Sequence, residues 1–287
     1  MAAVFVFVVG MHRSGTSAVA GALVELFGYD AIARPVDSNP RGQWERPEMR
    51  LQLDALLALN GGTWRRPSPA DHSISPGPLD QVLRRSFAKH CRAPGMWKDP
   101  RLCLSIDYWL SVAADEGRES KVVFIHRHPL AVAESLQVRN GWLIERGLAL
   151  WERTNRNAVL RLGGRDVAAV DYARLVADPE ATLRSLCQML DPEATFDPKR
   201  LRRAADTIDE ISEKAPAKTD STVDALCPTW SDLRGFHDVM TALGTGSAEP
   251  AEVTRILGQA TITERAQATA RGARALLRTR RAGQITH

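Results

Sequence analysis

Apolar runs alternate with amphipathic segments along the first two thirds of the chain. Residues 4–9 are continuously β-branched or aromatic, which predicts a strand buried on both faces of a parallel sheet. Runs of similar character at 121–126 and 167–171 predict two more strands. Helical spacing of apolar residues predicts helices at about 17–27, 49–59, 79–91, 131–138 and 178–190. This alternation predicts an α/β fold, in which right-handed crossovers join parallel strands.

Turn-forming residues separate these elements. The stretches 34–46 and 63–78 are polar and contain several prolines, so we expect both to be loops. Pro129 follows the second predicted strand and is expected at the first position of the next helix. Ligands of parallel α/β sheets bind beyond the carboxyl ends of the strands. We therefore expect a functional site where residues 10–17 and 126–135 meet.

The segment after the first strand has the composition of an anion-binding loop. It runs from Gly10 to Gly15 and leads into a helix, so backbone N–H groups and the helix dipole converge there. A Walker A loop has lysine directly after its second glycine, but this chain has Thr16. The cation is Arg13 instead, two residues before Gly15. A loop of this kind is poorly suited to a nucleoside triphosphate.

The second strand is followed by another candidate anion site. Arg127 leaves the end of that strand, and Ser135 lies eight residues later on the expected helix. A guanidinium and a hydroxyl in these positions can hold one phosphate from two directions.

Together, the loop Arg13-Ser-Gly-Thr-Ser and the pair Arg127 and Ser135 resemble the motifs of sulfotransferases that use 3′-phosphoadenosine 5′-phosphosulfate (PAPS). In that family the loop binds the 5′-phosphosulfate, and the Arg and Ser bind the 3′-phosphate. The resemblance implies a P-loop-type three-layer fold with a central parallel sheet, PAPS as donor, adenosine 3′,5′-bisphosphate (PAP) as product, and no metal. It also implies a set of nucleotide-binding residues: Arg13, Ser14, Gly15, Thr16, Ser17, Arg127, Ser135 and Tyr172.

Two further segments supply candidate catalytic residues. Lys98-Asp99-Pro100 resembles the Lys-Asp-Pro of tyrosylprotein sulfotransferases, whose lysine stabilises the transferring sulfuryl group, and Asp99 could cap a helix starting near Pro100. Glu45 follows a tryptophan, and a carboxylate beside an aromatic wall can have a raised pKa suited to a general base. By this resemblance the catalytic residues are Glu45, Arg13 and Lys98.

The glutamate in tyrosylprotein sulfotransferases is closer in sequence to the loop arginine, so Glu48 and His12 remain alternatives as the base. Tyr172 belongs to a Tyr-x-x-Leu segment that resembles one near the nucleotide in many sulfotransferases, but a tyrosine at the edge of the core fits the sequence equally well. The resemblance covers roughly residues 4–190. The glycine-rich C-terminal motif of small-molecule sulfotransferases is missing, so Lys214, Lys218 or the C-terminal tail are candidates to complete the 3′-phosphate site.

Charge is distributed unevenly. Residues 251–287 hold seven arginines and two glutamates, whereas the rest of the chain holds 31 basic and 32 acidic residues. We therefore predict one domain at 1–250 and a basic, mainly helical extension at 251–287, and we expect no nucleic-acid partner. The extension could be a solvated helix or could contact an acidic membrane surface.

The remaining features concern the cellular compartment. Four cysteines (91, 103, 187 and 227) lack metal-ligand spacing, so reduced and mostly buried thiols are expected. The apolar N-terminus lacks the basic region and cleavage site of a signal peptide, and no run is long enough to span a membrane. A cytoplasmic protein is expected, and the composition, rich in Ala and Arg, favours a bacterial origin.

The predicted activity is in-line transfer of a sulfuryl group from PAPS to a hydroxyl of a carbohydrate, lipid or natural product. The loops 34–48 and 63–78 and part of the C-terminal third are expected to contact this acceptor, with Trp44, Trp64 and Trp142 available for stacking. Two alternatives remain: a P-loop small-molecule kinase, which would require magnesium and ATP, and a non-catalytic nucleotide-binding protein on the same scaffold.

Overall fold

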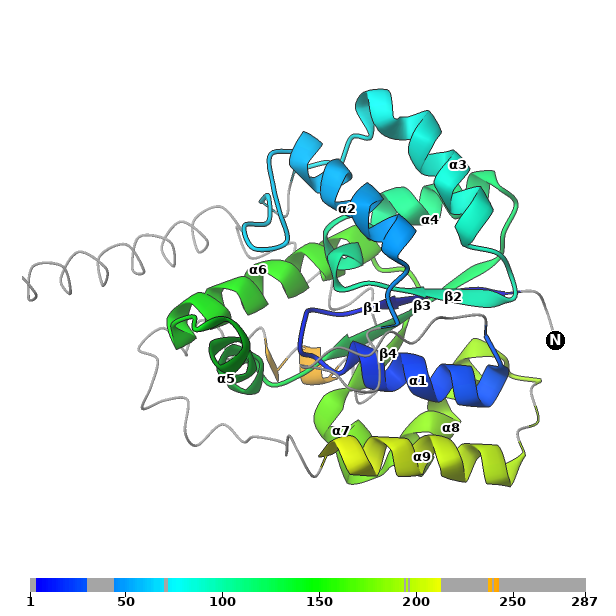
Figure 1. The fold of residues 1–287 in the computed structure, drawn as a ribbon. Coiled ribbons are helices and arrows are strands. Elements are labelled where there is room, and N and C mark those ends of the chain that lie inside the picture. Colours follow the sequence, from blue (N-terminus) through cyan, green and yellow to red (C-terminus); the bar gives the residue numbers. More distant parts are fainter. Residues whose placement is uncertain are drawn as a thin grey trace, which may run out of the picture.

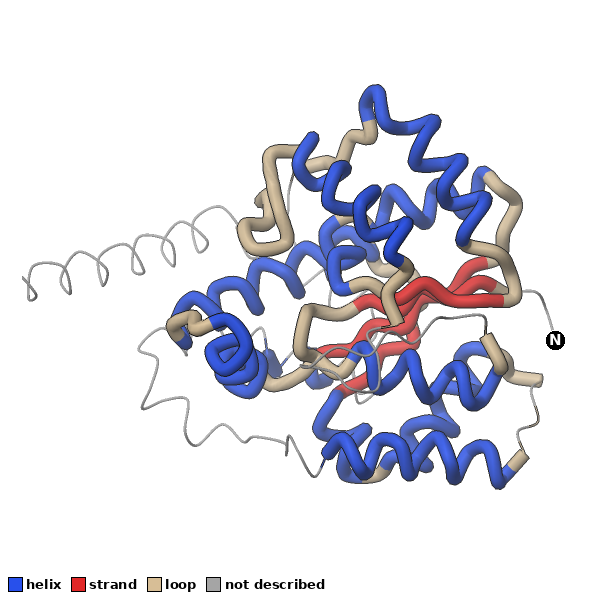
Figure 2. The backbone as a smooth tube through the Cα atoms, in the orientation of Figure 1, coloured by secondary structure: helices blue, strands red, loops and turns tan. Residues whose placement is uncertain are grey.

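A computed structural model describes residues 4–29, 44–69, 72–193, 195, 197–212, 237–238 and 240–242. Within these residues, one parallel sheet has the strand order β2-β1-β3-β4. The sheet lies between the helices, as the red segments of Figure 2 show. The strands are β1 (Phe5–Val9), β2 (Gly95–Lys98), β3 (Ser120–His126) and β4 (Ala168–Asp171). The predicted α/β class and the three predicted strands are confirmed.

Strand β2 was not expected from the sequence. It has four residues, including a glycine and a lysine, so no apolar run marks it. It forms because it pairs with β1, Phe7 lying opposite Trp97, and because all four of its residues are buried. This pairing brings Lys98 to the end of an edge strand, beside the loop that follows β1.

Helices cover both faces of the sheet (Figure 1). Alternate residues of β1 explain this arrangement, because Phe5, Phe7 and Val9 pack into one apolar cluster while Val6 and Val8 pack into another. The first cluster includes residues of α2, α3, α4 and α6, and the second includes residues of α1, α7, α8 and α9. The three-layer arrangement expected from the sequence is thus present.

The helices confirm the five helical segments predicted between residues 17 and 190, including Pro129 as the first residue of α5. Helices α4, α6, α7 and α9 were not predicted. In chain order the helices are α1 (Thr16–Phe27), α2 (Pro47–Leu59), η1 (Gly77–Leu79), α3 (Asp80–His90), η2 (Pro100–Leu104), α4 (Ile106–Asp115), α5 (Pro129–Asn140), α6 (Ile144–Leu162), α7 (Tyr172–Ala177), α8 (Pro179–Leu190) and α9 (Pro198–Ser212).

Several sequence-based expectations concern residues outside the described ranges. These are most of the loop 34–48, Lys214, Lys218, Cys227 and the basic extension 251–287. The other three cysteines are free and buried, as expected: Cys91, Cys103 and Cys187. In the part of the chain that the structure describes, no helix has both the length and the apolar character needed to cross a membrane.

Candidate active site

The loop after β1 has a backbone that restricts which residues it can contain. Gly15, the N-cap of α1, has a φ of 94°, and Arg13 also has a positive φ of 73°. A Cβ atom at Gly15 would lie 2.5 Å from Cδ2 of Tyr172, so both the backbone angle and the close approach require glycine. The predicted strand, loop and helix N-terminus are confirmed, and the first N–H groups of α1 point out of the helix end.

Two other loop residues are buried beside this helix end. Ser14 and Thr16 are both almost inaccessible to solvent. The Ser14 hydroxyl oxygen has no hydrogen-bond partner among the described residues. A buried hydroxyl in this position can donate to an oxyanion bound at the helix end, which fits a phosphate or sulfate group.

Arg13 connects the loop to the second predicted anion motif. Its Nε donates a 2.7 Å hydrogen bond to Oγ of Ser135 on α5, and Nη1 of Arg127 donates to the Arg13 carbonyl at 3.3 Å. The Arg127 guanidinium lies 4.4 Å from the ring centroid of Tyr172, the first residue of α7. Two motifs that are distant in sequence therefore meet at the ends of β1, β3 and β4.

Burial weakens the solvation of these two cations. Desolvation lowers the pKa of Arg13 and of Arg127, and Arg127 is further lowered by the nearby charge of Arg13. Arginines with such high starting pKa values remain charged at neutral pH. Two desolvated positive charges side by side provide a strong electrostatic attraction for a bound anion.

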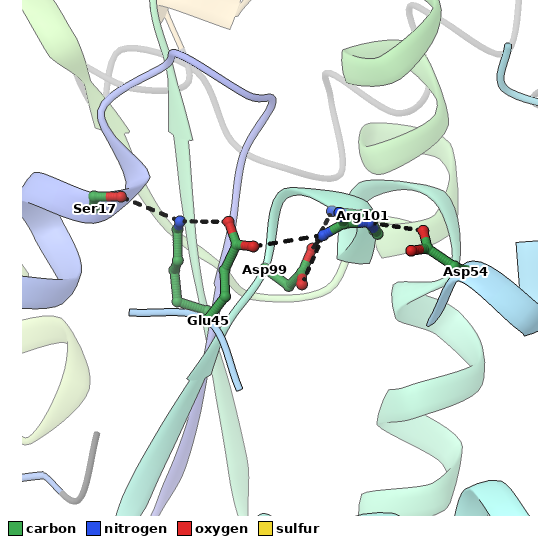
Figure 3. A network of polar contacts seen from close by, with 6 residues as sticks. Ser17, Glu45, Asp54, Asp99 and Arg101 are labelled. Carbon is green, nitrogen blue, oxygen red and sulfur yellow. Dashed lines mark hydrogen bonds and ion pairs between the residues drawn. The ribbon is translucent and has the colours of Figure 1, made fainter. Parts of the chain in front are cut away.

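Lys98 lies on the other side of the loop. Its Nζ donates to Oγ of Ser17 at 3.1 Å and to Oε1 of Glu45 at 3.2 Å (Figure 3). The lysine is buried, and this burial lowers its pKa, although the carboxylate of Glu45 acts in the opposite direction. Lys98 therefore links the candidate base to the helix that begins at the loop.

Arg101 pairs with the second carboxylate oxygen of Glu45, a role that the sequence did not indicate. Its Nη1 lies 3.6 Å from Oε2 of Glu45, and Nε pairs with Asp54 of α2 at 2.9 Å (Figure 3). Nη1 also bonds Asp99 at 2.9 Å, and the Asp99 side chain caps η2 by accepting from the Arg101 N–H. The capping role expected for Asp99 is confirmed. Its pKa is raised to about 6 by burial and then by the charge of Glu45.

The two alternative bases differ in position. His12 stacks on Trp64 with ring centroids 4.3 Å apart. Its pKa lies well below the ordinary value because of burial and then the charge of Arg101, with Arg139, Lys98 and Arg13 adding to the effect. His12 is therefore neutral at pH 7. Glu48 is exposed in the first turn of α2, outside the contacts of Lys98 and Arg101.

The three tryptophans proposed for stacking do not form one wall. Trp64 and Trp142 lie together, with ring centroids 5.7 Å apart. Trp44 instead packs against α1, where its ring lies 3.5 Å from the position of a Cβ on Gly21. The first pair adjoins the loop through the contact of Trp64 with His12.

Among the described residues, no cluster of three or more histidine, cysteine, aspartate or glutamate side chains has the geometry of a metal site. What the site does contain is a set of cations around a helix N-terminus, with one carboxylate, Glu45, paired to two of them. This chemistry suits a ligand with several anionic groups.

One comparison with known proteins agrees with this chemistry. A model of the sulfotransferase family matches residues 6–197. A search of curated proteins gave no match. Three similar solved structures are the sulfotransferase domain of the curacin biosynthetic pathway, the sulfotransferase domain of the Synechococcus olefin synthase, and a sulfotransferase of Mycobacterium tuberculosis.

The matches to these structures cover most of each chain, but the sequence identities and the TM-scores are low. The curacin domain is 18% identical and the match covers 69% of this chain and 76% of that domain, with a TM-score of 0.41. The Synechococcus domain is 21% identical, and the match covers 79% of this chain and 94% of that domain, with a TM-score of 0.39. The mycobacterial enzyme is 19% identical, and the match covers 74% of this chain and 76% of that enzyme, with a TM-score of 0.40.

Proposed function

The chain belongs to the sulfotransferase family, and we propose that it transfers a sulfuryl group from PAPS to a hydroxyl of a carbohydrate, lipid or natural-product acceptor. The observation that carries the choice of donor is the hydrogen bond between Arg13 and Ser135, with Arg127 bound to the Arg13 carbonyl. Two phosphate-binding motifs joined in this way suit a nucleotide that has a phosphate at its 3′ position and a phosphosulfate at its 5′ position.

In this proposal the loop binds the 5′ end of the donor. Backbone N–H groups at the start of α1 and the hydroxyls of Ser14, Thr16 and Ser17 surround the 5′-phosphosulfate. The unpartnered hydroxyl of Ser14 supports this assignment, since a buried donor group there is satisfied by a bound oxyanion. Arg127 and Ser135 bind the 3′-phosphate, and Tyr172 supports Arg127 through the contact of its ring with the guanidinium.

Arg13 and Lys98 act on the charge that develops during transfer. As the S–O bond to the donor breaks, negative charge accumulates on the bridging oxygen of the leaving nucleotide. Both cations are held by fixed partners before the reaction, Arg13 by Ser135 and Lys98 by Ser17. Preorganised donors of this kind stabilise a transition state by about 3 kcal/mol each.

Glu45 removes the proton of the acceptor hydroxyl. Its two carboxylate oxygens are paired with different cations, Lys98 and Arg101, so its orientation is fixed. Arg101 is in turn fixed by Asp54 and Asp99, which makes it a positioning residue for the base. The acceptor oxygen attacks sulfur in line as its proton passes to Glu45, and the sulfuryl group leaves PAP.

Binding and transfer test this proposal separately. Arg13→Ala and Arg127→Ala should each abolish PAP binding measured by calorimetry, whereas Arg202→Ala, which changes an exposed residue of α9, should bind normally. Unchanged PAP affinity in both site variants would falsify the assignment of the donor.

Activity separates a transferase from the two alternative functions. Incubation with ³⁵S-labelled PAPS and a panel of hydroxyl acceptors should give a labelled product in the presence of a chelator. Hydrolysis of ATP that requires magnesium would instead indicate a kinase. PAP binding without transfer to any acceptor of the panel would indicate a binding protein.

A further inference from the structure

Beside the loop, two tryptophans and three arginines form a surface that the proposed donor site does not use. We call Trp64, Trp142, Arg65, Arg139 and Arg146 the arginine–tryptophan surface. The guanidinium carbon of Arg65 lies 5.1 Å from the ring centroid of Trp64 and 5.9 Å from that of Trp142. Arg146 lies 4.0 Å from the Trp142 ring, and Arg139 lies 5.7 Å from the Trp64 ring.

This surface is continuous with the proposed reaction centre. His12, which precedes Arg13 in the loop, stacks on Trp64 with ring centroids 4.3 Å apart. Arg139 follows Ser135 by one helical turn on α5, and its charge contributes to the lowered pKa values of His12. An acceptor that reaches Glu45 from this side would therefore pass over the arginine–tryptophan surface.

Within the described residues, the arginines of the surface are not paired with carboxylates, although the charge of Glu45 acts on Arg139 from a distance. Arg65, Arg139 and Arg146 form no ion pair with a carboxylate of the described residues, and Arg139 donates only to the neutral Oδ1 of Asn140. By contrast, Lys98 and Arg101 are paired with carboxylates. The burial of Arg139 lowers its pKa, and the positive charge of Arg13 adds to this effect.

The aromatic contacts leave the arginines able to bind an anion. A guanidinium stacks on an aromatic ring through its flat face, while its N–H donors point outward in its own plane. The three guanidinium carbons lie 4.0–5.9 Å from the ring centroids of Trp64 and Trp142, and contacts with ring faces use none of the arginines' hydrogen-bond donors. Planar guanidinium groups held in this way match carboxylate and phosphate oxygens.

We propose that the arginine–tryptophan surface binds an anionic group of the acceptor, so that this enzyme selects hydroxyl compounds carrying a carboxylate or a phosphate. The inference rests on the proposed function, because it assigns the surface to the acceptor and leaves the donor on the loop. The donor has its own cations in Arg13, Arg127 and Lys98. The two assignments therefore predict different effects of mutation.

The test uses three probes that share one hydroxyl-bearing ring: phenyl β-D-glucoside, phenyl β-D-glucuronide and phenyl β-D-glucoside 6-phosphate. They are titrated into the full-length, PAP-bound protein, and binding is followed by saturation-transfer NMR. We expect at least one of the two anionic probes to bind about tenfold more tightly than the neutral one, because a charge-assisted hydrogen bond contributes this much or more. Whichever of the two anionic probes binds more tightly shows whether the surface prefers a carboxylate or a phosphate.

The variant for this test is the double substitution Arg65→Ala and Arg146→Ala, since both side chains are exposed and their removal should not affect folding. It should reduce the anionic preference to less than twofold and leave PAP affinity unchanged. The matched control is the double substitution Arg184→Ala and Arg202→Ala, which removes two exposed arginines of α8 and α9.

Three results would overturn the inference about the acceptor. The first is equal binding of the neutral and anionic probes by the unaltered protein, and the second is an anionic preference that survives in the double variant. Loss of PAP affinity in the double variant would also overturn it, because the surface would then belong to the donor site. Failure of the donor assignment itself is detected independently, by normal PAP binding in Arg13→Ala and Arg127→Ala.

Discussion

Nε of Arg13 donates a hydrogen bond of 2.7 Å to Oγ of Ser135, although the two residues are separated by 122 positions in the sequence. Each residue belongs to a motif that could be recognised alone. The structure shows in addition that the motifs share a direct contact, so each motif orients a residue of the other.

This contact predicts that the two residues act as a unit in nucleotide binding. Ser135→Ala should weaken PAP binding by about 1–2 kcal/mol, since it removes one hydrogen bond to a charged group and one ligand contact. Calorimetry on Arg13→Ala, Ser135→Ala and the double variant should show a coupling energy of at least about 0.5 kcal/mol. Ser86→Ala is the control, because that hydroxyl contacts Met49 and neither Arg13 nor Ser135. Strictly additive losses would show that the contact has no part in binding.

Glu45 should be required for turnover but not for donor binding. Glu45→Gln keeps the shape of the side chain and removes its ability to take a proton, so kcat should fall by roughly 10²–10⁴-fold while PAP affinity changes little. Glu48→Gln alters an exposed neighbour in the same region and should be fully active. If Glu45→Gln were as active as the parent and Glu48→Gln were impaired, the base would have to be reassigned.

Gly15 should be sensitive to a single added methyl group. Gly15→Ala places a Cβ at a φ of 94° and 2.5 Å from Tyr172, so both backbone strain and a steric clash are expected. The strain alone costs about 1–2 kcal/mol. Gly28→Ala has a similar positive φ of 67° but nothing within 4 Å of the added carbon, so it measures the strain without the clash. Urea unfolding should show a larger loss for Gly15→Ala, together with loss of PAP binding, and equal losses in the two variants would contradict the close contact with Tyr172.

Stability should decrease in mild acid because of His126. Burial lowers the pKa of this histidine from 6.5 to about 4, so the unfolded state binds a proton more readily than the folded state between these values. The contribution of neutral His126 to the unfolding free energy is complete above pH 6.5. The unfolding free energy falls by about 3 kcal/mol from this contribution as the pH falls to 4. His126→Gln can still donate to the carbonyl of Met240 but cannot titrate, so its unfolding free energy should vary less between pH 7 and pH 5. An exposed histidine variant, His72→Gln, should retain the pH dependence of the parent, and a His126→Gln profile identical to both would contradict the prediction.

The sequence was most informative where a single local segment carries the signal. Strand β1 could be predicted because five buried apolar residues are consecutive. The positions of Arg127 after a strand and of Ser135 on the next helix could be predicted because both belong to one short segment. Strand β2 could not, since its four residues become a strand only by pairing with β1. The role of Arg101 depends on Glu45 and Asp54, which come from two other segments, so no local pattern could indicate it.

The ammonium group of Lys98 joins two parts of the site, because it contacts both the loop helix, through Ser17, and the candidate base, Glu45. Arg101 holds the second oxygen of Glu45, so the carboxylate is fixed relative to the end of α1. In the proposed reaction, a shorter side chain at position 98 would therefore misalign donor and acceptor even if each still bound.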